Sequence, residues 1–176
     1  MRTQVSSNEG RQQLLSAEAP TLEIKERLLC IAGLLILTSA FALGQKHPKA
    51  SDIPTSSLID PSNVAALIQS KSEKPLILQV GSHVLFQQAH VPGSEYVAAA
   101  STPEGREQLR KRVGSLPKDK FIVLYCGCCP WEHCPNVQPA YKELHDLGFT
   151  NLKVMYIAND FGKDWVEKGY PVSKGD

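Results

Sequence analysis

Four of the chain's five cysteines lie close together in the segment LYCGCCPWEHCPN, residues 124–136. The thiolate form of cysteine is nucleophilic and binds soft metals, and two nearby thiols form a disulfide. The segment therefore offers three kinds of chemistry: a reactive thiol, a disulfide staple or a metal site. His133 lies in the same segment, and a protonated imidazole there would lower a thiol pKa or pass a proton.

The predicted elements on either side of this segment single out Cys126. The apolar run FIVLY before it predicts a buried strand, and NVQPAYKELHDLGF after it predicts an amphipathic helix that stops at Gly148. Ligands gather at the carboxyl ends of parallel strands, and loop amides with the positive end of a helix favour an anion there. We therefore expect Cys126 to carry a stabilised thiolate and to be the nucleophile.

The rest of the chain, from about residue 51, alternates between strand and helix patterns. Further strands are predicted over 75–80 and 152–157, and an extended piece follows the Pro92-Gly93 turn. Helices are predicted over DPSNVAALIQS, SHVLFQQ, PEGREQLRKRVGSL and FGKDWVEKG. Such alternation predicts an α/β fold, in which helices flank a central, mostly parallel sheet in three layers.

Composition restricts the class of protein. A chain of 176 residues with 42% hydrophobic and 21% charged residues is sufficient for one globular domain. Its formal net charge of +1 gives no electrostatic footprint for nucleic acid, so we expect no nucleic-acid partner.

The N-terminal part differs from the domain. Residues 1–27 form a polar leader without periodicity, which predicts disorder. Residues 28–44 are uncharged and apolar, follow Lys25 and Arg27, and end in small residues, as in the h-region of a signal peptide or a membrane anchor. We assign 45–55 to a linker and 56–174 to the domain. The expected location is extracytoplasmic, in the periplasm, either exported or anchored through 28–44.

Several motifs in this domain resemble the rhodanese family. An apolar strand and short helix precede AHVPGS, which is similar to the family's Gly-His-Ile-Pro-Gly-Ala. FIVLYC resembles the strand that delivers the family's active-site cysteine, and DWVEKGYPV is similar to its closing Trp-x-x-x-Gly-Tyr-Pro-Val. The resemblance covers about residues 51–172 and implies a rhodanese-like α/β domain with Cys126 as the catalytic residue.

The chain also departs from the rhodanese pattern. The family's Asp-Val-Arg after the early strand is Gln79-Val80-Gly81 here. The segment between Cys126 and the next helix is about four residues longer than the usual loop of six, and it contains no Arg or Lys. Thiosulfate would therefore lack its expected cationic partner, which leaves the sulfur donor open.

The function that the resemblance implies is sulfur transfer, of the thiosulfate sulfurtransferase type. The Cys126 thiolate would take the outer sulfur of a donor as a persulfide and pass it to a thiophilic acceptor. Donor and acceptor would be small-molecule or protein thiols, and the reaction needs no cofactor. Gly127 and the other loop residues would support this chemistry. Two alternatives are a thiol–disulfide redox protein and a non-catalytic rhodanese-like module that binds partners or carries a metal.

The remaining loop cysteines, Cys128, Cys129 and Cys134, have several interpretations. In an oxidising compartment, Cys128 or Cys129 would pair with Cys134 in a disulfide. One of them would otherwise act as a resolving thiol toward an oxidised or persulfidated Cys126. A zinc or copper site is a further alternative, but the spacing differs from paired Cys-x₂-Cys knuckles, so we assign no metal ligands.

Overall fold

The structure, a computed structural model, describes residues 50–72 and 74–176. The predicted leader 1–27, the apolar segment 28–44 and the linker up to residue 49 lie outside the described residues. Within the described ranges, no helix has the length and apolar character required to cross a membrane.

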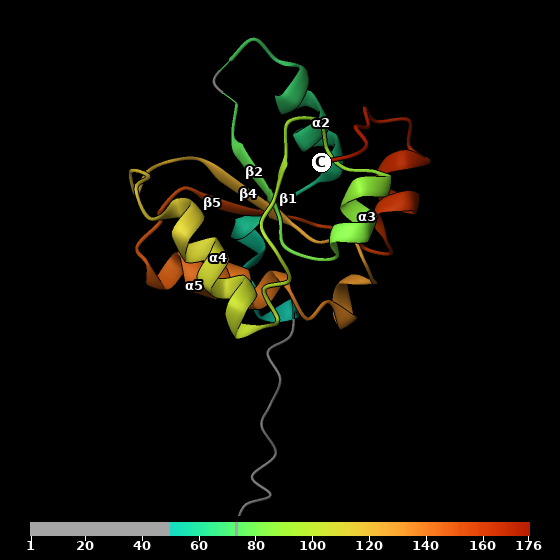
Figure 1. Ribbon diagram of the computed structural model, residues 1–176. Helices are drawn as coiled ribbons and strands as arrows, with labels where there is room; N and C mark the ends of the chain where they lie inside the picture. Colours follow the sequence, from blue (N-terminus) through green and yellow to red (C-terminus); the bar gives the residue numbers. More distant parts are fainter. Residues whose placement is uncertain (1–49, 73) are drawn as a thin grey trace, which may run out of the picture. The chain divides into compact units, whose positions relative to one another are not determined.

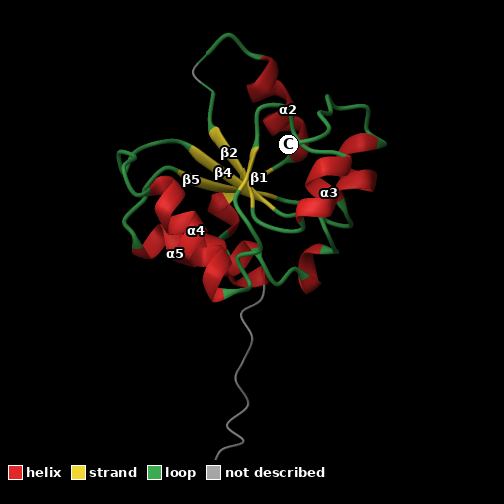
Figure 2. Cartoon of the chain, in the orientation of Figure 1, coloured by secondary structure: helices red, strands yellow, loops and turns green. Residues whose placement is uncertain are grey.

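A parallel sheet forms the centre of the described domain. Its strand order is β1-β5-β4-β2-β3, and every paired strand runs parallel to its neighbour. Figure 2 shows the strands gathered in the middle with helices on both sides. The predicted α/β fold with a parallel sheet is therefore confirmed. The strands are β1 (Leu58–Ile59), β2 (Leu76–Gln79), β3 (Glu95–Tyr96), β4 (Ile122–Tyr125) and β5 (Leu152–Met155).

The helices form where caps and apolar periodicity predict them. Pro61 and Pro103 occupy first helical turns, and the Thr102 hydroxyl accepts a hydrogen bond from the Gly105 N–H at 3.0 Å. The α-helices are α2 (Pro61–Gln69), α3 (His83–Gln88), α4 (Pro103–Val113) and α5 (Val137–Asp146). Shorter turns are η1 (Ala50–Asp52), η2 (Thr55–Ser57), η3 (Trp131–His133) and the π-helical η4 (Gly162–Val166).

Successive side chains of β4 enter two different cores. Ile122 and Leu124 pack with residues of α4 and α5, whereas Val123 and Tyr125 pack with residues of α2 and η4. Because all four are buried, β4 is covered on both faces, as expected for a central parallel strand. Figure 1 shows α4 and α5 next to each other on one side of the sheet. This covering holds the end of β4, and hence Cys126, in a fixed position.

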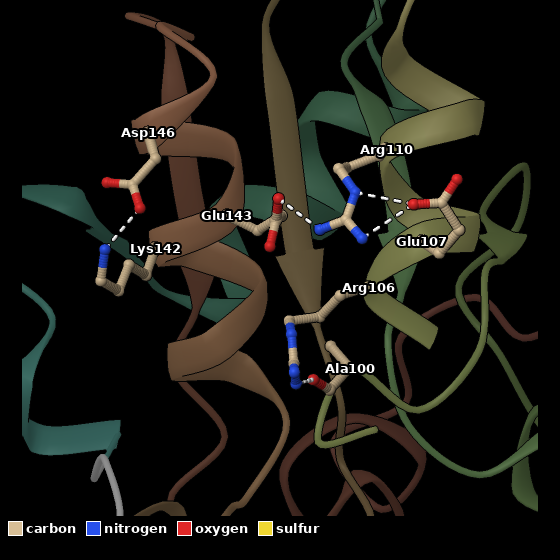
Figure 3. Close-up of polar contacts among 7 residues, drawn as sticks. All are labelled: Ala100, Arg106, Glu107, Arg110, Lys142, Glu143 and Asp146. Atoms are coloured by element: carbon tan, nitrogen blue, oxygen red, sulfur yellow. Dashed lines mark hydrogen bonds and ion pairs between the residues drawn. The ribbon is translucent and has the colours of Figure 1, made fainter. Parts of the chain in front are cut away.

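Polar contacts align α5, the helix that follows the cysteine segment, with α4. The Arg110 guanidinium donates to Glu143 on α5 at 2.8 Å and to Glu107 on its own helix at 2.9 Å (Figure 3). Such exposed ion pairs contribute little to stability, because water screens them. The larger contribution comes from buried residues between the helices and the sheet, among them Leu109, Val113, Ala140 and Leu144.

The end of the predicted linker lies against the domain core. Ala50 and Ile53 are buried and belong to the same core as α4 and α5. Both lie before residue 56, where we placed the start of the domain, so the packed structure extends into the assigned linker. Their apolar side chains are too few to give a periodic pattern, which is why the sequence does not reveal this packing.

Candidate active site

Cys126 directly follows β4, at the carboxyl end of the parallel sheet. The neighbouring strand β2 ends in Gln79, whose side chain is buried between the two strand ends. Its Nε2 donates to the carbonyl oxygen of Cys126 at 3.2 Å, and its Oε1 accepts from the Gly81 N–H at 3.1 Å. Gln79 therefore satisfies backbone groups that the sheet leaves unpaired and fixes the position of Cys126.

Two glycines allow the cysteine segment to lie close to its surroundings. A Cβ on Gly81 would lie 2.5 Å from the sulfur of Cys126. Gly127 has φ of +73°, and a Cβ there would lie 2.8 Å from the Cβ of Phe161. The Phe161 N–H also donates to the Gly127 carbonyl at 3.0 Å. Position 127 thus requires glycine for both its backbone angle and its close contact.

A methyl group at position 81 tests this crowding. We expect Gly81→Ala to slow any reaction at the Cys126 sulfur by about 10²-fold. The sulfur must move away from the added methyl group, and this displaces it from its position for attack. The measurement is the rate of Cys126 modification by a sulfane sulfur donor, followed by mass spectrometry. Gly114→Ala is the matched control, since Gly114 is exposed and has right-handed helical angles. Equal rates for the two variants would contradict the prediction.

A cavity of about 410 Å³ opens over the two cysteines nearest β4, Cys126 and Cys128. Asp160 is the one charged residue in its lining, and the lining contains no lysine or arginine. Two rim side chains, Leu85 and Val166, are exposed hydrophobics. The cavity therefore favours a ligand that is apolar or weakly charged. The lining residues are Gln79, Leu85, Gln88, Ala89, Tyr125, Cys126, Gly127, Cys128, Asp160, Phe161, Gly162 and Val166.

The four loop thiols converge on one another. The sulfurs of Cys126 and Cys128 lie 3.0 Å apart, and those of Cys128 and Cys129 lie 3.5 Å apart. Cys126 is 3% exposed, whereas Cys128 is partly exposed. All four cysteines of the segment are free thiols in this structure, so the disulfide to Cys134 stays a prediction. Among the residues that the structure describes, no group of histidine, cysteine and acidic side chains is arranged to hold a metal ion.

The thiol contacts shift the titration of the cluster. The hydrogen bond from Cys126, followed by that from Cys134, lowers the pKa of Cys128 well below its ordinary value. The same contact with Cys128, then contact with Cys134 and burial, raises the pKa of Cys126 far above its ordinary value. These opposite shifts favour negative charge on Cys128 over Cys126 within the cluster.

This distribution of charge corrects the expectation that Cys126 itself carries the stabilised thiolate. The start of α5 does supply amides, but the N–H groups of Asn136 and Val137 act on Cys134. The hydrogen bond from Cys126 lowers the pKa of Cys134, but contact with Cys128 and burial together raise it. The net result is a raised pKa for Cys134. The sequence places a helix start near Cys126, but it does not specify which sulfur those amides reach.

Asn136 is a further site residue that the sequence does not reveal. Its buried side chain donates from Nδ2 to the sulfur of Cys126 at 3.4 Å and approaches that of Cys128 at 3.9 Å. Its Oδ1 accepts from the Ser101 N–H at 3.0 Å, which fixes the orientation of the amide. The amide N–H therefore stabilises negative charge on either sulfur.

Reversing the polarity at Asn136 should change the pH dependence of the thiols. Asn136→Asp keeps the acceptor for Ser101, but it replaces the donor with a negative charge, which raises the pKa of the neighbouring thiols. We expect the pH midpoint of Cys128 alkylation by iodoacetamide to rise by about one unit. Peptide mass spectrometry across a pH series measures it. Asn151→Asp, at an exposed position, should leave the midpoint unchanged, and equal midpoints for all three proteins would contradict the assignment.

The predicted site residue His133 and the neighbouring Trp131 lie at the edge of the cluster. The side chain of His133 is exposed, and it is the backbone carbonyl of His133 that accepts a hydrogen bond from the Cys129 sulfur, at 3.7 Å. Trp131 is buried, and its ring lies tilted against that of Tyr156 with centroids 5.1 Å apart. Its backbone N–H donates to the Ala158 carbonyl. These contacts close the segment on the side away from the cavity.

Comparisons with solved structures identify the fold. The Alr3790 protein from Anabaena sp. superposes with a TM-score of 0.52 at 16% identity, over 66% of this chain and 82% of that one. A solution structure of the rhodanese-like domain of Alr3790 gives a TM-score of 0.50 at 18% identity, over 67% and 79%. The BH2092 protein from Bacillus halodurans gives 0.51 at 18%, over 68% and 77%.

Comparisons by sequence add nothing to this result. No model of a known protein family matches the chain, and no curated protein matches it. The structural likeness agrees with the AHVPGS turn and with a cysteine directly after the central strand β4. The described part of this chain has the rhodanese-like fold.

Proposed function

We propose that this protein is a sulfurtransferase in which Cys126 carries the sulfur as a persulfide. The observation that carries the proposal is the position of the Cys126 sulfur: it lies at the end of the central strand, lines the cavity, and accepts a hydrogen bond from Asn136. A sulfur atom held in this way is positioned to attack a donor that enters the cavity.

The sulfurs of Cys126 and Cys128 lie 3.0 Å apart, and the pair shares one proton. The favoured arrangement has the negative charge on Cys128, and the attack starts from the other arrangement, in which the proton lies on Cys128 and the charge on Cys126. Cys126 then attacks the outer sulfur of the donor, and the remainder of the donor leaves with its electron pair. The arrangement of nucleophile, adjacent base and orienting amide is the general one for an activated nucleophile.

The cavity supports a donor of low negative charge. Thiosulfate carries two negative charges, which would face Asp160 without a lysine or arginine in the lining. An aryl thiosulfonate has one charge fewer, and its ring matches the apolar rim at Leu85 and Val166. Persulfides of small molecules or proteins satisfy the same requirement, and we propose these as the physiological donors, with thiols as the acceptors.

Neutralising Asp160 should therefore favour an anionic donor. Asp160→Asn keeps the oxygen that accepts from the Lys163 N–H at 2.9 Å and removes the charge. We expect kcat/KM for thiosulfate to rise about fivefold, which corresponds to about 1 kcal/mol of removed repulsion. Steady-state kinetics with thiosulfate and benzenethiosulfonate measure it. Asp119→Asn, which lies outside the lining, is the control, and an equal gain in that variant would contradict the proposed charge effect.

The test of the function itself is the detection and mapping of the sulfur. Purified protein is treated with one equivalent of benzenethiosulfonate, and intact mass shows whether a sulfur atom is taken up. Mapping on Cys126, together with the appearance of free sulfinate, supports the proposal. Sulfur on Cys128 with Cys126 unmodified, or neither sulfur uptake nor sulfide release with any sulfane sulfur donor, contradicts it.

A second candidate function is thiol–disulfide exchange without sulfur transfer. The 3.0 Å contact between the Cys126 and Cys128 sulfurs favours it, because such a pair can form a disulfide with a small movement. Reversible oxidation of this pair by a disulfide substrate, without uptake of sulfur from any donor, would support this candidate. We also propose that the protein is extracytoplasmic, because residues 28–44 resemble a signal peptide or a membrane anchor. Fractionation of the native host would test this location.

A further inference from the structure

The sequence Cys126-Gly127-Cys128 forms a turn that brings two thiols into contact. Gly127 has φ of +73°, an angle that glycine adopts readily, and the two sulfurs on either side of it lie 3.0 Å apart. A disulfide requires about 2.05 Å, so a displacement of about 1 Å joins them. The backbone of this turn therefore already holds the pair near bonding distance.

Cys128 differs from the other loop thiols in its access to Cys126. It both contacts the Cys126 sulfur and lines the cavity. Cys129 contacts Cys128 at 3.5 Å and directs its own sulfur toward the His133 carbonyl, and it is absent from the cavity lining. Cys134 also contacts Cys126, but it is buried and absent from the cavity lining. Of these three cysteines, Cys128 alone both contacts the Cys126 sulfur and lines the cavity.

We propose that Cys128 is a resolving thiol, which attacks the sulfur of persulfidated Cys126, forms a Cys126–Cys128 disulfide and releases the transferred sulfur as hydrosulfide. The inference rests on the proposed function, since it requires the persulfide to form first. It adds a second activity to the site: in the absence of an acceptor thiol, the protein converts sulfane sulfur into sulfide.

The atoms and electrons of this step balance within the cluster. In the first step the proton of Cys126 passes to Cys128, and Cys126 becomes an anionic persulfide. Cys128 then returns that proton to the terminal sulfur and, as a thiolate, attacks the inner sulfur. The inner S–S bond breaks, and hydrosulfide leaves with the electron pair. The terminal sulfur is reduced to sulfide, and the two cysteine sulfurs are oxidised to a disulfide.

The surroundings of the two sulfurs favour this step. The Asn136 amide reaches both sulfurs, at 3.4 Å and 3.9 Å, and thus stabilises charge as it moves between them. The raised pKa of Cys126 and the lowered pKa of Cys128 agree with Cys128 as the attacking group. Return to the resting state requires two electrons from a dithiol, which attacks the disulfide at the more exposed Cys128 sulfur.

A single-turnover experiment tests the proposal. Reduced wild-type protein, freed of small thiols and kept anaerobic, receives one equivalent of benzenethiosulfonate, which contains no sulfide. We expect about one sulfide released per chain and an intact mass lower by two hydrogen atoms. After alkylation, the tryptic peptide from Phe121 to Lys142 should carry label on Cys129 and Cys134 but not on Cys126 or Cys128. Dithiothreitol should restore the starting mass.

Variants separate this inference from the proposed function. Cys128→Ser, with Cys128→Ala as a second replacement, should retain the added sulfur on Cys126 and release no sulfide until an external thiol is added. Cys129→Ser should behave like the wild type. A stable persulfide in the wild type, or sulfide release that persists in both Cys128 variants, overturns the resolving role and leaves the sulfurtransferase intact. Absence of sulfur uptake and of sulfide in every protein overturns both proposals.

Discussion

Replacement of Cys126 with serine should abolish sulfur transfer, with a loss of about 10³-fold or more. A serine hydroxyl fits the space beside Gly81, but it remains protonated and does not form a stable sulfur adduct. The fold should be retained, because the backbone contacts of residue 126, including the hydrogen bond from Gln79 to its carbonyl, do not involve the sulfur. The measurement is sulfur transfer from benzenethiosulfonate to dithiothreitol.

The matched control for this variant is Cys129→Ser, which changes a thiol of the same segment that does not line the cavity. Thermal unfolding of both variants verifies that they fold. If Cys126→Ser retained more than about a tenth of the wild-type rate, another sulfur would be the nucleophile, and Cys128 would be the first to examine because of its position and lowered pKa.

The second large effect concerns stability and arises at Trp165. This side chain is fully buried on η4, donates from Nε1 to the Pro171 carbonyl at 2.7 Å, and stacks at 5.7 Å on Phe161. We expect Trp165→Ala to lower the free energy of unfolding by about 3–5 kcal/mol, since it removes a large buried ring and leaves a cavity. Chemical denaturation monitored by circular dichroism measures the loss.

Two further variants at η4 resolve the contributions to this effect. Trp165→Phe retains an aromatic ring against Phe161 but removes the N–H donor, so we expect a smaller loss of about 1–2 kcal/mol. Glu167→Ala, at an exposed position directly after η4, should change stability by less than about 0.5 kcal/mol. A loss below about 1 kcal/mol for Trp165→Ala would show that the packing of η4 is not important for the fold.

Trp165 also connects stability with the site. Phe161, on which it stacks, lines the cavity and donates its backbone N–H to Gly127. Loss of the indole should therefore loosen the wall of the cavity and the turn that holds Cys126 and Cys128 together. A parallel decrease in sulfide release would agree with this connection.

The elements around Cys126 were predictable because their signals are local. A run of apolar residues marks β4, and apolar periodicity with a glycine stop marks α5, so the order of strand, cysteine and helix follows from neighbouring residues. By contrast, β1 has only two residues and η3 only three, which is too short for either periodicity to appear. Both elements exist because of tertiary contacts.

The partners of Cys126 were not predictable for a related reason. Gln79 is separated from Cys126 by 47 residues and Asn136 by 10. Neither residue belongs to a sequence pattern that indicates contact with Cys126. The position of the thiolate depends on sulfur–sulfur distances of 3.0 Å and 3.5 Å, which no pattern of cysteines specifies. The sequence therefore indicates a candidate nucleophile, whereas the charge on its neighbour follows only from three-dimensional geometry.

The narrow gap at Gly81 has a consequence for engineering. A cation for strongly anionic donors cannot be grafted at position 81, where the rhodanese pattern that the sequence resembles has an arginine. A Cβ at this position would meet the Cys126 sulfur at 2.5 Å. Changes that alter donor preference must instead be made at the rim of the cavity, where the side chains of Leu85 and Val166 are exposed.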